Sequence, residues 1–120
     1  MHFLGGAPDP DPEFYADDEA LFVDIAAAYD EDIADIASRG ARFVTLDDVP
    51  FPMLCDPMIR GQLEKQGKDP ERLLDQYIEL TNASFASAPS DMTVGLHRCR
   101  GNPQGTRRSE GSYQARSEEL

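Results

Sequence analysis

The chain has 120 residues, a length that favours a single domain. Its 23 acidic and 11 basic residues give a formal net charge of -12, which argues against binding to nucleic-acid phosphates. No apolar run is long enough to span a bilayer, and no basic segment precedes an apolar stretch at the N-terminus. These features predict a cytoplasmic protein.

The negative charge is concentrated in the first half of the chain. Residues 1–60 hold 14 acidic and 3 basic residues, whereas residues 61–120 hold 9 acidic and 8 basic residues. The two halves could attract each other, or the first half could present a solvated acidic face. The solvated face is the favoured interpretation.

The N-terminal third predicts a short strand, a loop and a long helix. Residues 1–4 form the strand, and a segment rich in Gly and Pro follows. The acids at 17–19 suit the first turn of a helix, and Gly40 is suited to its C-terminal end. Apolar residues at steps of three and four predict the buried face of this helix: Leu21, Ile25, Tyr29, Ile33 and Ile36.

Two strands and two helices are predicted in the rest of the chain. Residues 42–47 are β-branched and apolar, which predicts a buried strand, and the Pro-rich segment 49–57 predicts a loop. A short helix over 58–66 ends at Gly67.

The second helix begins at Asp69, which precedes a Pro and an acid, and it stops by Pro89. Its predicted buried face contains Leu73, Leu74, Tyr77, Ile78, Thr81 and Phe85. A second strand over 92–96 ends at His97.

The alternation of strands and helices predicts an α/β fold with parallel strands. Two architectures fit this order, a doubly wound sheet and a (β/α)8 barrel. In both, the C-terminal ends of the strands lie on one face of the sheet, where sites are built.

Both predicted strands end in reactive side chains at that edge. Asp47 and Asp48 follow the first strand, and His97 and Cys99 follow the second. Each has an alternative role without chemistry, since Asp47 could cap the next segment and His97 could be a surface histidine. Their coincidence at one edge favours a functional site.

The His97-Arg98-Cys99 spacing favours a metal site. Side chains two apart on extended backbone point the same way, and imidazole nitrogen and thiolate sulfur are preferred ligands of zinc, which takes four. Arg98 and Arg100 would favour the thiolate, or alternatively be solvated or bind an anion.

The sequence does not identify the remaining zinc ligands. Cys55, Glu110 and His2 are candidates, although Cys55 also suits a buried apolar position. No nucleotide-phosphate motif and no nucleophilic triad is evident, and no catalytic acid or base stands out.

Three segments resemble the C-terminal catalytic barrel of the cobalamin-independent methionine synthase family, and its single-barrel relatives most of all. They read YDEDIADIASRGARFVTLDDVPFPMLCD, then LDQYIELTNASFASAPSDMTVGLHRCRGN, then SEGSY. The H-x-C-R-G-N block following the strand with its paired acids carries most of the resemblance. It covers nearly the whole chain and weakens after Asn102.

The resemblance implies a (β/α)8 barrel that binds zinc and acts in methionine biosynthesis. The family is a methyltransferase class in which zinc activates a thiol such as homocysteine, whose thiolate takes the methyl group of a methylated folate. It implies that His97 and Cys99 are zinc ligands and that Asp47 binds the substrate's amino group.

This sequence departs from the family pattern after Cys99. The family takes a further Glu and Cys ligand from later strands, and a complete barrel needs about 250 residues. We therefore expect residues 1–120 to be a single partial barrel domain, with a poorly defined tail over 103–120. Such a chain would self-associate or pair with a missing barrel half. Two alternatives remain: a non-catalytic remnant of the barrel, or a related zinc enzyme acting on a different thiol.

Overall fold

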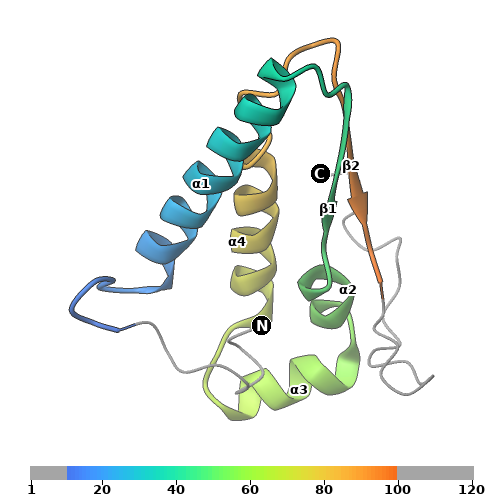
Figure 1. Cartoon of the computed structure of the whole chain (residues 1–120). Helices are drawn as coiled ribbons and strands as arrows, with labels where there is room; N and C mark the ends of the chain where they lie inside the picture. The colour runs from blue at the N-terminus through green and yellow to red at the C-terminus, as the bar shows by residue number, and fades with distance from the viewer. Residues whose placement is uncertain (1–10, 100–120) are drawn as a thin grey trace.

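The computed structural model describes residues 11–99, which form two neighbouring helices, a pair of strands and two shorter helices (Figure 1). In chain order the elements are α1 (Asp18–Ser38), β1 (Phe43–Asp47), α2 (Pro50–Leu54), α3 (Pro57–Lys65), α4 (Pro70–Ala83) and β2 (Thr93–His97). The predicted strand over 1–4 and the predicted tail over 103–120 lie outside the described residues, as do His2, Arg100 and Glu110.

Strands β1 and β2 pair in parallel, which confirms the predicted α/β class. The register runs from Phe43 opposite Thr93 to Asp47 opposite His97. The connection between the two strands contains α2, α3 and α4, as a parallel pair requires a long crossover. The predicted last residues of the two strands are therefore direct neighbours.

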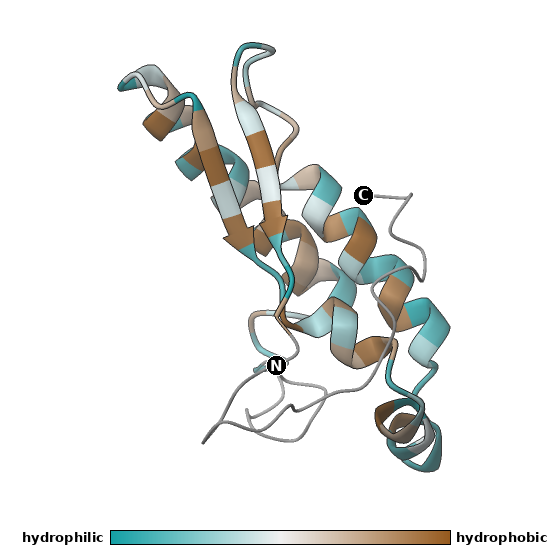
Figure 2. Cartoon of the chain, turned by 90° about the vertical axis from the view of Figure 1, so that its right-hand side faces the viewer, coloured by the Kyte–Doolittle hydropathy of each residue, from teal (hydrophilic) through white to brown (hydrophobic). Residues whose placement is uncertain are grey.

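One face of this strand pair is exposed and the other is turned toward the helices. Along β1, Phe43, Thr45 and Asp47 are exposed, whereas Val44 and Leu46 are half-buried. Side chains alternate along a strand, so Asp47 shares the exposed face with the residues two and four positions before it. Figure 2 shows apolar residues alternating with near-neutral residues along most of β2.

The predicted start of α4 and the predicted ends of α1 and α3 are confirmed by capping contacts and by backbone conformation. The Asp69 carboxylate accepts hydrogen bonds from the backbone N–H groups of Glu71 and Arg72, at 3.0 and 3.2 Å. Gly40 and Gly67 follow α1 and α3 with φ of 100° and 75°, in the left-handed region where glycine carries no Cβ penalty.

The loop predicted over 49–57 is wrong, because α2 and the start of α3 occupy this segment. Proline is tolerated in the first turn of a helix, where its missing N–H would have no partner. The Asp48 carboxylate accepts a hydrogen bond from the Phe51 N–H at 3.1 Å, which supports the first turn of α2. Prolines that exclude a strand thus start two short helices here.

The last predicted helix stops before Pro89, as predicted, but its end at Ala83 leaves out Phe85, which the sequence places on its buried face. The backbone N–H and the hydroxyl of Ser84 both donate to the Leu80 carbonyl, and the chain then turns. Phe85 therefore lies beyond the helix, where it packs against a small cluster around Ile33, Ala37 and Met92. The predicted burial of Leu73, Leu74, Ile78 and Thr81 is confirmed, while Tyr77 is half-buried against the main core.

The buried face of α1 agrees with the prediction only in part. Its most buried residues are Phe22, Ala26, Ile33 and Ala37, and Tyr29 is exposed. The small Ala26 suits the close packing of α1 against α4. Leu21, Ile25 and Tyr29 instead line an open groove of about 380 Å³ that also reaches β1 and β2. The predicted burial of Ile33 is confirmed, Leu21, Ile25 and Ile36 are half-buried, and the predicted burial of Tyr29 is wrong.

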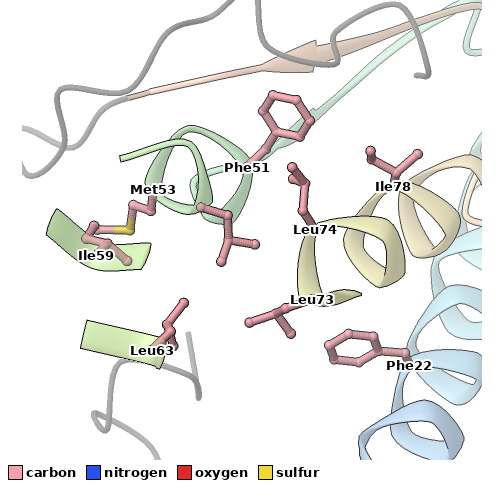
Figure 3. Packing of buried hydrophobic residues seen from close by; sticks show 9 residues of the cluster. Phe22, Phe51, Met53, Ile59, Leu63, Leu73, Leu74 and Ile78 are labelled. Carbon is pink, nitrogen blue, oxygen red and sulfur yellow. The ribbon is translucent and has the colours of Figure 1, made fainter. Parts of the chain in front are cut away.

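The main core joins all four helices (Figure 3). Phe22 comes from α1, and the remaining buried members come from the three later helices: Phe51, Met53, Leu54, Ile59, Leu63, Leu73, Leu74 and Ile78. The ring centroids of Phe22 and Tyr77 are 5.1 Å apart in a tilted arrangement. This core fixes the strand pair through α2, whose first turn follows β1 directly. Among the helices of residues 11–99, none is long and apolar enough to cross a membrane.

A polar contact ties α1 to the segment after α4. The Asp30 carboxylate accepts hydrogen bonds from the backbone N–H and the hydroxyl of Ser87, both at 2.6 Å. These bonds hold the pKa of Asp30 below its ordinary value.

We expect Asp30→Asn to lower the free energy of unfolding at pH 7. Because the pKa is depressed in the folded state, the stabilisation is present above the ordinary Asp pKa and is lost as the pH falls through the folded value. Denaturant titrations at pH 7 and pH 3 should show a smaller difference between the parent and the variant at the lower pH. Asp32→Asn, which changes an exposed acid on the same helix, is the control. If the parent and Asp30→Asn differed by the same free energy of unfolding at both pH values, the role given to the Asp30 carboxylate would be contradicted.

Candidate functional site

The structure brings two of the predicted site residues into contact. The imidazole Nδ1 of His97 lies 2.7 Å from Oδ1 of Asp47, with the two side chains 60% and 79% exposed. They come from the paired ends of β2 and β1, so the parallel register itself sets their separation. With Nδ1–H donating to the carboxylate, Nε2 is the ring nitrogen left to accept or to bind a metal.

Cys99 lies two residues beyond His97, just past the end of β2, and is half-buried. Neither of the two cysteines is in a disulfide. Within residues 11–99, no three His, Cys, Asp or Glu side chains come together as a group able to hold a metal ion. His97 and Cys99 therefore supply at most half of the ligands that zinc takes.

A charged pair lies beneath the exposed residues. Asp48 and Arg98 follow Asp47 and His97 in the chain, and Arg98 Nε lies 3.8 Å from Asp48 Oδ2, with both side chains at most 15% exposed. The Arg98 guanidinium also lies over the ring of Phe51, 4.1 Å from its centroid. Burial raises the pKa of Asp48, although the Phe51 N–H and the Arg98 charge both oppose this shift.

The sequence did not reveal this second layer. The sequence groups Asp48 with Asp47 at the strand end, and it suggests for Arg98 an effect on the Cys99 thiol, solvation or binding of an anion. The alternation of side chains along a strand could have indicated the buried positions. In Asp47-Asp48 and in His97-Arg98, successive side chains point to opposite sides. Each strand end thus sends one residue to the exposed face and one toward the core.

Cys55, a candidate zinc ligand in the sequence, belongs to the packed interior of the chain. It follows α2, is half-buried and packs against the main core. Burial raises the pKa of the Cys55 thiol more than the charges of Arg60 and Arg98 lower it. These surroundings suit the apolar role considered for Cys55 in the sequence.

We expect the Cys55 thiol to react slowly with iodoacetamide in the folded chain. Because its pKa is raised, the thiolate fraction at pH 8 is smaller than that of an unperturbed cysteine. The rate should be measured in Cys99→Ser, with the same variant unfolded in urea as the control. Equal rates in the folded and unfolded chain would contradict the buried assignment.

The described residues define a mixed α/β protein in which a carboxylate and an imidazole meet at the C-terminal ends of two parallel strands. The chain is similar to two Bacillus subtilis (strain 168) proteins, both named as uncharacterized. It is 34% identical to YxjG over 121 residues and 33% identical to YxjH over 120 residues. All of this chain is aligned, but only 32% and 31% of the two relatives, so it spans about a third of their length. No family model matches the chain, and no solved structure matches it.

Proposed function

We propose that the chain forms part of a (β/α)8 barrel that carries a zinc-dependent methyltransferase site of the cobalamin-independent methionine synthase type. The observation that carries this proposal is the contact between Asp47 and His97 at the carboxyl ends of paired parallel strands, with Cys99 two residues further on. Barrel enzymes build their sites at this end of the strands.

The outer edges and the two faces of the strand pair support the proposal of a barrel. Within residues 11–99, β1 and β2 pair only with each other, so each has an outer edge that can accept a further strand. The exposed face that carries Asp47 and His97 would line the barrel interior, and the face with Leu46 and Leu96 is turned toward the helices. Further strands would come from the rest of a longer protein, a second copy, or a separate barrel half.

The residues present fit zinc as part of its ligand set. Imidazole nitrogen and thiolate sulfur are the ligand types that zinc prefers. Ligating histidines commonly donate their second ring N–H to a carboxylate, and His97 has this partner in Asp47. His97 would bind through Nε2 and Cys99 through its sulfur, and two further ligands would come from outside residues 11–99, where His2 and Glu110 are the candidates within this chain.

The chemistry requires a thiolate and a bound amino group. Zinc, when bound, lowers the pKa of a coordinated thiol so that the thiolate is present near neutral pH. The carboxylate of Asp47 gives the ammonium group of an amino-acid thiol such as homocysteine a charge-assisted partner. In the proposed transfer, a bond forms between the substrate sulfur and the methyl carbon of a methylated folate, and the bond between that carbon and the folate breaks.

Zinc titration of the metal-free chain at pH 7 tests the proposal. We expect tight binding of about one zinc ion per chain, measured by competition with a chromophoric chelator. His97→Ala and Cys99→Ser should each abolish this tight binding with little change in helix content by circular dichroism, because both positions lie outside the core. Cys55→Ser, which changes a cysteine packed against the core, is the control for thiol content.

Weak or absent binding by the unaltered chain would support the other interpretation, a non-catalytic remnant of the barrel. A collapse of helix content in His97→Ala or Cys99→Ser would show that these residues are structural.

A further inference from the structure

Two charged side chains are buried next to the proposed site, on the opposite side of the strand ends. Asp48 and Arg98 are largely buried, whereas their chain neighbours Asp47 and His97 are exposed. Charged residues are seldom buried unless they are paired, so the position of Asp48 and Arg98 calls for a physical reason.

Three contacts connect these residues to the turn after β1. The Asp48 carboxylate accepts from the Phe51 N–H, and the Arg98 guanidinium stacks over the Phe51 ring. The backbone N–H of Asp48 donates to the carbonyl of His97 at 2.9 Å. Segment 48–51 and segment 97–98 are thus joined by backbone, charge and ring contacts at once.

Stability alone is a weak explanation for this arrangement. A buried ion pair recovers little more than its desolvation cost, and well-packed apolar residues in its place are often as stable. The separation of 3.8 Å between Arg98 Nε and Asp48 Oδ2 is also longer than a charge-assisted hydrogen bond. What the contacts do specify is the direction in which the chain leaves β2.

We propose that Asp48 and Arg98 are positioning residues that fix the backbone of residues 97–99, so that His97 and Cys99 face the same point on the exposed side. This inference rests on the proposed function, because that point is the proposed zinc site. Asp48 and Arg98 act through the backbone, since their own side chains are directed to the opposite side of the strand ends.

The test uses the double variant Asp48→Asn/Arg98→Met, which removes both charges while keeping an acceptor at position 48 and an apolar stem near Phe51. We expect its unfolding midpoint to stay close to that of the parent. Its zinc affinity should fall by about 10- to 100-fold, the range for groups that orient metal ligands. With Co²⁺ as the probe, the thiolate-to-cobalt absorption band should weaken or shift.

A metal-free readout separates this inference from the proposed function. Backbone amides of residues 97–99 should exchange faster in the metal-free double variant than in the parent. Unchanged zinc affinity and unchanged exchange would overturn the positioning role. If the parent binds no zinc, the proposed function fails, and amide exchange alone decides whether Asp48 and Arg98 fix this segment.

Arg98→Lys covers the case in which the double variant does not fold. Lysine keeps the positive charge opposite Asp48 but loses the planar group that stacks on Phe51. We expect a folded chain with weaker zinc binding and faster exchange at residues 97–99. Parent-like values for both would overturn the inference.

Discussion

Asp47→Ala is expected to lower the zinc affinity of the chain by about 10- to 100-fold, because it removes the acceptor that orients the His97 ring. Asp47→Asn keeps an oxygen that can accept from Nδ1–H, so it should change zinc affinity much less. Competition with a chelator measures the zinc affinities of the parent, Asp47→Asn and Asp47→Ala, which we expect to decrease in that order. Loss of zinc binding in Asp47→Asn would instead show that Asp47 is itself a ligand.

The same Asn variant isolates the second role proposed for Asp47. It removes the negative charge that would pair with a substrate ammonium group. Homocysteine should therefore bind more weakly to Asp47→Asn than to the parent, whereas a thiol of similar size without an amino group should bind both equally. Calorimetric titration of zinc-loaded protein measures the two thiols. An equal loss for both would contradict recognition of the amino group.

Leu54→Ala is expected to lower the free energy of unfolding by about 2–5 kcal/mol, the range for truncating a fully buried leucine. Leu54 is 0% exposed and belongs to the main core shared by all four helices. Urea denaturation followed by circular dichroism measures the change. For a small domain, this loss is a large share of the total stability.

Met58→Ala is the matched control for the core prediction. Met58 lies in the neighbouring helix α3 and is 65% exposed, so its truncation should cost far less. Equal losses in the two variants would show that the cluster around Leu54 does not carry the stability of the chain.

Local signals in the sequence were sufficient for most element positions. The strand over 43–47 follows from its β-branched apolar composition, and the start of α4 follows from Asp69 and Pro70, whose capping contacts form within three residues. The parallel pairing followed from the long helical connection between the two strands. The meeting of Asp47 and His97 at one edge then needed only the rule that parallel strands end together.

Other features depended on contacts between distant segments, which no local pattern encodes. The Pro-rich segment became α2 because Phe51, Met53 and Leu54 complete the main core. The N-terminal part of α1 buries Phe22 and Ala26, one position on from the predicted Leu21 and Ile25, so that Leu21, Ile25 and Tyr29 lie along the groove.

By itself, the sequence determined where most of the helices and strands form and which strand ends carry a carboxylate, an imidazole and a thiol. These properties depend on residues close together in the chain, through caps, turns and alternation. Only the tertiary structure decided that Asp47 contacts the His97 ring, while Asp48 and Arg98 turn inward over Phe51. The physical reason is that burial and charge pairing depend on which surfaces the packed helices cover, and residues 50 positions apart meet only after the core has formed.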